Sequence, residues 1–271
     1  MLRGTSMMSS TRPALSLSSP LTRTTLNNIK TILAHKYDAD IDRYDPSEAH
    51  AAVLVPLCNV NNKPGILFEI RGKLRTHSGE VSFPGGRVDE DDLSPQDAAL
   101  RETHEEVGIR PEQIEILGRF GPAETSLGGM RVWPFVGFIH PRGAKDNGQV
   151  SSSSTDAEME EALPSLSLSD LTLSPKEVAH AFHLPLSAVL SVPRLHHYLF
   201  RGQRPYFSID VSDIVTSNNP EEVVHSDGRT AWASDPQQRD EIGGGKEDRL
   251  EVWGLTGWYL NVLLRTLGVY E

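Results

Sequence analysis

The chain has 271 residues, and 38% of them are hydrophobic, so its length and composition suit one large folded domain or two small ones. Its 37 acidic residues outnumber its 26 basic residues and give a net charge of −11, which argues against a protein that binds nucleic acid through a basic face. A single cysteine, Cys58, excludes an intrachain disulfide and any metal site built from several cysteines.

Residues 1–37 differ from the rest of the chain because they contain five basic residues and no acidic residue. This composition is typical of an organelle transit peptide, and a disordered N-terminal tail can share it. Leu26, Ile29, Ile32 and Leu33 recur at helical spacing, which is consistent with a first helix of the domain. We therefore expect an intracellular and mitochondrial location, with the peroxisome and the cytosol as alternatives.

One folded domain is predicted over residues 38–271, and two polar segments interrupt it. Segments 143–176 and 218–249 have no sustained apolar period, so both are predicted to be disordered inserts. The apolar stretch 252–270 is broken by Asn261 and Arg265, and no membrane span is predicted.

Short apolar runs outside the inserts predict a mixture of strands and helices. Strands are expected at residues 51–57, 66–70, 114–120, 132–139, 197–200 and 206–209. Helices are expected at residues 95–107 and 256–267. Strands in mixed order with few helices favour an α/β fold of the α+β type, a sandwich of helices on a sheet.

The helix predicted over residues 95–107 has clear signals at both ends. Ser94 is a good N-cap, Pro95 suits the first helical position, and Asp97 completes a capping box. Gly108 is placed to end the helix in a left-handed conformation. At 100° per residue, the apolar face holds Ala99, Leu100, Thr103 and Val107.

Three glutamates, Glu102, Glu105 and Glu106, lie on an arc of this helix next to its apolar face. Carboxylates at these spacings repel one another, and the repulsion grows beside an apolar surface. One interpretation is a cage for a hard divalent cation such as Mg²⁺, and the other is a solvated acidic face with Arg101 paired to Glu105.

The segment from Gly85 to Ile109 resembles the signature box of the Nudix hydrolases. The residues that match the box are Arg101, Glu102, Glu105, Glu106, Gly108 and Ile109. Gly86 lies one residue too far from Arg101, and Leu93 stands where the box has a glutamate. Asp92 or Glu90 is expected to replace that glutamate as the partner of Arg101.

The resemblance implies a Nudix α/β/α sandwich with a mixed sheet and a hydrolase that requires Mg²⁺ or Mn²⁺. By the match to the box, Glu105 and Glu106 would be the primary metal ligands. Glu102 would be a ligand or a base that positions water, and Arg101 would orient the glutamates.

The residues before the box resemble the additional motif of the coenzyme A pyrophosphatase branch of this family. Leu74-Arg75-Thr76-His77-Ser78-Gly79-Glu80 leads into Phe83-Pro84-Gly85-Gly86, as in that motif. The resemblance implies cleavage of coenzyme A or its thioesters to a 4′-phosphopantetheine species and adenosine 3′,5′-bisphosphate. The residues expected on the substrate and phosphate side are Arg71, Arg75, His77, Gly79, Glu80, Gly85 and Gly86.

A further acid outside the box is expected to serve as the catalytic base, as in many Nudix enzymes. Glu177 is one candidate, and its alternative role is that of an acid at a helix N-terminus. Glu80 is the other candidate.

Two other functions stay open at the level of sequence. One is a Nudix pyrophosphohydrolase acting on oxidised (deoxy)nucleoside triphosphates or on dinucleotides, although the single cysteine argues against the branch with a four-cysteine zinc module. The other is a non-catalytic scaffold that binds a nucleotide, which would have no need of three clustered glutamates. The expected partner is a small molecule, and the sequence predicts no oligomeric state.

Overall fold

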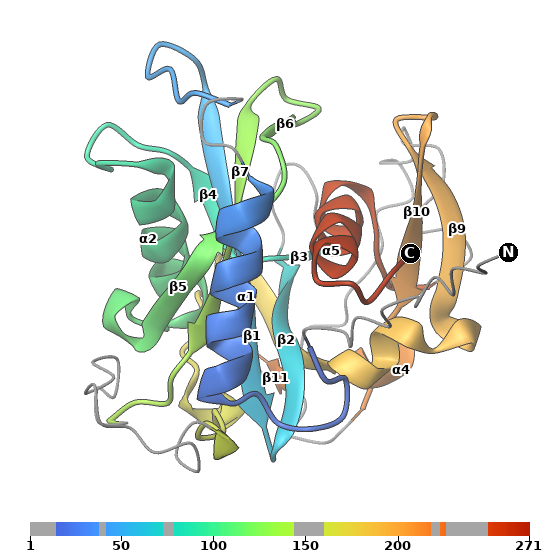
Figure 1. Ribbon diagram of the computed structural model, residues 1–271. Helices are drawn as coiled ribbons and strands as arrows, with labels where there is room; N and C mark the ends of the chain where they lie inside the picture. Colours follow the sequence, from blue (N-terminus) through green and yellow to red (C-terminus); the bar gives the residue numbers. More distant parts are fainter. Residues whose placement is uncertain (1–14, 38–41, 73–78, 144–159, 218–222, 226–248) are drawn as a thin grey trace, which may run out of the picture.

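A computed structural model describes residues 15–37, 42–72, 79–143, 160–217, 223–225 and 249–271 (Figure 1). The helices are α1 (Arg23–Lys36), α2 (Pro95–Val107), α4 (Ser212–Val215) and α5 (Gly254–Thr266). The strands are β1 (His50–Val60), β2 (Lys63–Arg71), β3 (Val81–Ser82), β4 (Gly85–Arg87), β5 (Ile114–Arg119), β6 (Glu124–Thr125), β7 (Arg131–Ile139), β8 (Val178–Pro185), β9 (Leu195–Phe200), β10 (Arg204–Asp210), β11 (Val223–His225) and β12 (Glu251–Val252).

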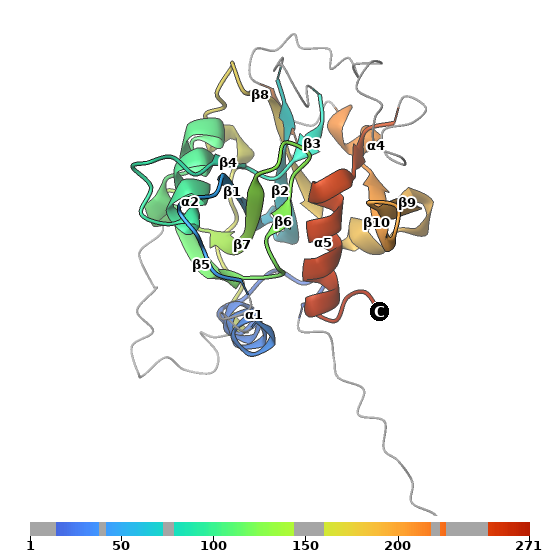
Figure 2. The same cartoon turned by 90° about the horizontal axis from the view of Figure 1, so that it is seen from above.

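The larger sheet is mixed, as predicted. Its strands follow the order β11-β8-β2-β1-β7-β5, while β3, β4 and β6 pair with β2, β1 and β7. Strands β1 and β7 run parallel with Ala52 opposite Trp133, and the other pairs in the sheet are antiparallel. Figure 2 shows these strands between α2 on one face and α5 on the other. This arrangement confirms the predicted sandwich.

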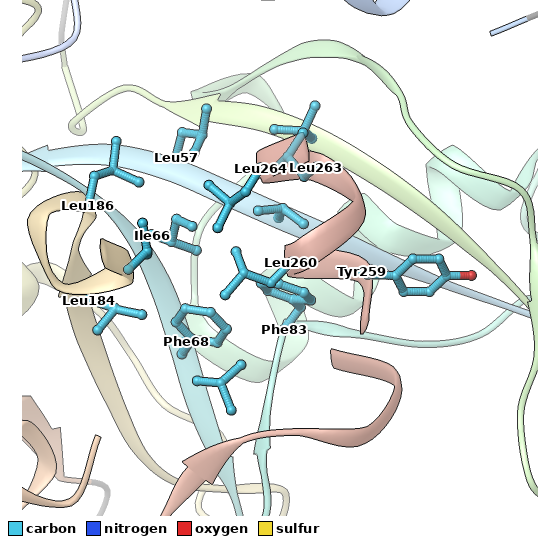
Figure 3. Packing of buried hydrophobic residues seen from close by; sticks show 14 of the residues in the cluster. Leu57, Ile66, Phe68, Phe83, Leu184, Leu186, Tyr259, Leu260, Leu263 and Leu264 are labelled. Atoms are coloured by element: carbon cyan, nitrogen blue, oxygen red, sulfur yellow. The ribbon is translucent and has the colours of Figure 1, made fainter. Parts of the chain in front are cut away.

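Two apolar cores lie on opposite faces of this sheet because side chains alternate along each strand. On β2, Phe68 points into the core on the α5 side of the sheet, where it contacts Phe83 (Figure 3). Leu67 belongs to the core on the α2 side. Glu69 follows two residues after Leu67, so the alternation turns its carboxylate toward α2. Cys58 is also buried on the α2 side, where burial raises the pKa of its thiol to about 12.

The N-terminal region contributes a helix to the fold. Helix α1 buries Leu26, Ile29 and Leu33 in the core on the α5 side of the sheet. Glu115 on β5 holds this helix through Arg23 at 2.6 Å and Lys30 at 2.7 Å. Residues from Arg23 onward therefore belong to the folded domain, although their composition resembles a transit peptide.

Parts of both segments that were predicted to be disordered inserts are ordered elements of the domain. Residues 160–176 lie against the domain, and four leucines enter the core on the α2 side of the sheet: Leu166, Leu168, Leu171 and Leu173. Within each pair, Leu166 and Leu168 or Leu171 and Leu173, the leucines are two residues apart, and the 3₁₀ helix Leu168–Asp170 connects the two pairs. Residues 223–225 form β11, which pairs with β8. The segments 144–159, 218–222 and 226–248 lie outside the described residues.

The elements near the C-terminus form a second, smaller sheet. Its three strands follow the order β12-β10-β9. Helix α5 is anchored to β10 by Asn261, whose side chain donates to the carbonyl of Phe207 at 2.7 Å and accepts from its N–H at 2.9 Å. In the part of the chain that is described, no helix combines the length and apolar character needed to cross a membrane.

Candidate active site

Helix α2 carries the three glutamates into different environments. The helix spans Pro95–Val107, with Ser94 as its N-cap and Gly108 at φ 76° as its C-cap, as predicted. Glu106 is only 4% exposed because it lies against the sheet. The side chain of Glu102 is 17% exposed and that of Glu105 is 52% exposed. The acidic arc therefore runs from the protein interior to the surface.

Arg101 organises the outer part of this arc. Its guanidinium donates to both carboxylate oxygens of Asp92, at 3.0 and 2.9 Å, and to Glu105 at 3.0 Å. It also contacts Glu102 at 3.1 Å and donates to the carbonyl of Arg87 at 2.9 Å. Asp92, and not Glu90, is thus the partner of Arg101 among the two acids that the sequence left open.

Glycines are required at the turn beside the helix. Gly85 has φ 151°, and a Cβ there would lie 2.2 Å from the carbonyl oxygen of Ala52. Its N–H donates to Glu106 Oε2 at 2.8 Å. A Cβ on Gly86 would lie 2.4 Å from Glu102 Oε1. The two glycines therefore let the backbone approach two of the three glutamates.

Glu69 is a buried acid of this site that the sequence analysis missed. It is fully buried on β2, where Ser82 Oγ donates to Oε1 at 3.0 Å and Arg71 Nη1 lies 3.9 Å away. Its other oxygen, Oε2, has no hydrogen-bond partner in the described structure. The signal in the sequence was a lone acid within the apolar run Ile66–Ile70.

Burial and mutual repulsion disfavour the charged forms of these acids. Burial, followed by the charge of Glu69, raises the pKa of Glu106 to about 9. Burial also raises the pKa of Glu69 to about 7. The pKa of Glu102 is raised mainly by burial, against the opposing effect of Arg101. The cluster thus lacks enough positive charge of its own to stabilise three carboxylates in their ionised forms.

Glu177 lies at the solvent side of the same cluster. Its carbonyl accepts from the N–H of Gly72 at 2.7 Å, and its carboxylate accepts from Ser174 Oγ at 3.2 Å. Its charge raises the pKa of both Glu69 and Glu102. It precedes β8, so the alternative of an acid at a helix N-terminus is wrong.

The described part of the chain includes only some of the residues expected on the substrate and phosphate side. The N–H of Arg71 donates to the carbonyl of Glu80, and the N–H of Gly79 donates to the carbonyl of Arg71, each at 2.9 Å. Both ends of the segment between them therefore lie next to Glu69. Arg75 and His77 lie outside the described residues.

The donor set fits Mg²⁺ or Mn²⁺. Hard carboxylate oxygens are the preferred ligands of these ions, and the orphaned Oε2 of buried Glu69 can accept a cation. In the described residues, no three acidic, histidine or cysteine side chains already surround one metal position. Glu102 and Glu105 are turned toward Arg101 instead. Binding of a metal ion would therefore require the carboxylates of Glu102 and Glu105 to reorient.

The sequence of this chain is similar to those of known proteins. Residues 48–186 match the model of the NUDIX domain. A protein named "Uncharacterized Nudix hydrolase NudL" from an Enterobacter species is 40% identical over 149 residues, which are 54% of this chain and 62% of that protein. The NudL of Photorhabdus laumondii is 37% identical over 61% of this chain and 76% of its own length. "Nudix hydrolase 3" of Caenorhabditis elegans is 28% identical over 89% of this chain and 82% of its own length.

Among solved structures, the NUDIX domain of Shewanella oneidensis NrtR complexed with ADP ribose matches with a TM-score of 0.35 and 17% identity. The match covers 59% of this chain and 85% of that one. The chain spans 62% of the length of the first two NudL relatives. The family model covers half of the chain, and the chain belongs to the Nudix hydrolase family.

Proposed function

We propose that this protein hydrolyses the diphosphate of coenzyme A or its thioesters, with Mg²⁺ or Mn²⁺ as the cofactor. The products would be a 4′-phosphopantetheine species and adenosine 3′,5′-bisphosphate. The observation that carries the proposal is the gathering of Glu69, Glu102 and Glu106 beside the glycine turn, with raised pKa values and little compensating charge. Such a cluster is costly for a protein that never binds a cation.

When bound, Mg²⁺ or Mn²⁺ would neutralise charge on the diphosphate and acidify water. The chain's own residues prepare for this in three ways. Arg101 and Asp92 hold the outer part of α2 in place, and the N–H of Gly85 orients Glu106. Glu177 is exposed at the edge of the cluster, where it can accept a proton from an attacking water.

The choice of coenzyme A rests on the motif that precedes the glycine turn. Arg71, which precedes this motif, and Gly79, which belongs to it, are joined by a backbone hydrogen bond of 2.9 Å, and Arg71 lies 3.9 Å from Glu69. The names of the NudL relatives state no substrate. They support membership of the hydrolase family, and the motif alone supports coenzyme A as the substrate.

The test is hydrolysis of coenzyme A and acetyl-coenzyme A in Mg²⁺ or Mn²⁺, with products identified by mass. Release of adenosine 3′,5′-bisphosphate is the expected result. An oxidised deoxynucleoside triphosphate and NADH serve as competing substrates. Efficient cleavage of either competitor without cleavage of coenzyme A would overturn the substrate assignment while leaving the hydrolase assignment intact.

A further inference from the structure

A pocket of about 350 Å³ lies at the C-terminal end of α2, where Glu105 is the one glutamate of the three that lines it. Ligand pockets typically enclose roughly 300–1,000 Å³, so it has room for a phosphorylated sugar. The polar residues that line it are His104, Glu105, Arg110, Arg142, Thr172 and Ser174.

The pocket shares residues with the candidate active site. Glu105 lines the pocket and also accepts a hydrogen bond from Arg101 at 3.0 Å. Ser174 lines it too and donates to Glu177 at 3.2 Å. A ligand in the pocket would therefore lie directly beside a substrate bound at the acids.

Positive charge prevails among the lining residues. Two arginines face one glutamate, and that glutamate is already paired with Arg101. Arg110 lies 3.8 Å from Glu112, and both side chains are more than half exposed, so water screens this ion pair. The hydrogen bond from the N–H of His140 to the carbonyl of Gln113, at 2.8 Å, ties the segment of Arg142 to that of Arg110.

The C-terminal end of α2 does not oppose an anion here, although the last carbonyls of a helix normally carry partial negative charge. The carbonyl of His104 accepts from Gly108 at 3.0 Å, that of Glu106 accepts from Ser174 at 2.9 Å, and that of Val107 accepts from Thr172 at 3.2 Å. Three of the last four carbonyls of the helix are therefore hydrogen-bonded within the protein, and Arg110 and Arg142 supply the positive charge of the pocket.

From this geometry we infer that the pocket binds the 3′-phosphate on the ribose of the substrate, through Arg110 and Arg142. The inference rests on the proposed function. Binding of the 3′-phosphate in this pocket would let the protein distinguish coenzyme A from substrates that lack this phosphate. A single ribose separates the 3′-phosphate from the diphosphate, which matches a pocket that shares Glu105 with the acidic cluster. Arginine is suited to this task because its guanidinium forms two parallel hydrogen bonds to a phosphate.

The test compares kcat/KM for coenzyme A and for 3′-dephospho-coenzyme A. The wild-type protein should prefer the 3′-phosphorylated substrate, and Arg110→Ala or Arg142→Ala should each lower this preference about tenfold, the effect of losing one charge-assisted hydrogen bond. Arg142→Lys should retain part of it. Arg265→Ala is the matched control, because Arg265 lies at the exposed end of α5 and lines a different pocket. A preference unchanged in both alanine variants would overturn the inference.

Binding of the product provides a readout that does not depend on catalysis. By titration calorimetry, the wild-type protein should bind adenosine 3′,5′-bisphosphate more tightly than AMP, and Arg142→Ala should reduce this difference in affinity about tenfold. If no form of coenzyme A is cleaved, the proposed function fails, and the calorimetry still decides whether the pocket recognises a 3′-phosphate. Equal affinity of the wild-type protein for both nucleotides would refute the pocket assignment.

Discussion

Arg101 donates two hydrogen bonds to Asp92, at 3.0 Å from Nε and 2.9 Å from Nη2, and so joins α2 to the loop that follows the glycine turn. Asp92 replaces the glutamate that the signature box has at the position of Leu93. The acid that pairs with Arg101 thus lies one residue earlier in the loop than in the signature box, and it is an aspartate instead of a glutamate. The second carboxylate contact of Arg101, with Glu105, extends this arrangement to the surface.

Asp92→Ala should lower both stability and activity. Arg101 would lose its bidentate partner, at a cost of about 1–3 kcal/mol in the free energy of unfolding. Arg101 lowers the pKa of Asp92, so the stabilisation is present above the ordinary pKa of an aspartate and is lost as the pH falls below it. Urea unfolding at pH 7 and kcat/KM measure the two effects. Glu90→Ala, at an exposed position, is the control, and an equal loss in both variants would contradict the assignment.

Glu105→Gln should abolish most activity while leaving the fold intact. The loss in kcat/KM is expected to be about 100-fold, similar to the loss of one electrostatic group in a catalytic site. Because the side chain is 52% exposed, the free energy of unfolding should change by less than about 0.5 kcal/mol. Steady-state kinetics and urea unfolding test both statements, with Glu112→Gln as an exposed control. Full activity in Glu105→Gln would show that Glu105 is not part of the active site.

Stability of the metal-free protein should fall as the pH rises from about 5 to 9. Burial and the neighbouring Glu69 raise the pKa of Glu106 in the folded protein above its value in the unfolded chain, so the folded state holds more protons in this range. Each pH unit then costs at most about 1.4 kcal/mol. Glu106→Gln should flatten the profile, as measured by urea unfolding between pH 5 and pH 9. Parallel profiles for the two proteins would show that Glu106 is not the titrating group.

Glu69→Gln should weaken metal binding without disrupting the sheet. Loss of one buried carboxylate is expected to lower the affinity for Mn²⁺ about tenfold or more, as for other residues that support a metal site. In the wild-type protein, Mn²⁺ should raise the melting temperature more at pH 8 than at pH 5.5, since protons compete for the same acids. Calorimetric titration with Mn²⁺ measures the affinity, and Glu48→Gln is the exposed control. Equal affinities in the two variants would exclude Glu69 from the metal site.

Glu115→Ala should destabilise the domain by releasing α1. Its carboxylate accepts from Arg23, Lys30 and His140, which together lower its pKa. Removing it leaves buried positive charge without a partner, at a cost of about 2–3 kcal/mol. Chemical unfolding measures this loss, with exposed Glu112→Ala nearby as the control. Similar midpoints for both variants would mean that α1 is held by its apolar face alone.

The helix that carries the site could be predicted from sequence because its signals are local. Ser94, Pro95 and Gly108 act within one or two turns of their own positions, and the structure places the helix ends where these residues predicted them. Six of the twelve strands in the described part of the chain were also predicted, because a run of apolar residues is visible over a few positions. Strand β8 was missed as an element, and its sequence Val178–Pro185 has no long apolar run because two histidines interrupt it.

Local sequence signals predict individual elements, and they do not predict which distant residues contact one another. The sequence by itself determined the family box, the acidic helix and the glycines at the turn, because each depends on nearby residues. Only the tertiary structure decided that Asp92 is the partner of Arg101 and that Glu69 joins the cluster. Only the fold brought Ser174 to Glu177 and Arg142 to the pocket. The physical reason is that burial and electrostatic coupling depend on which strands and loops pack together, and that packing is not encoded in local spacing.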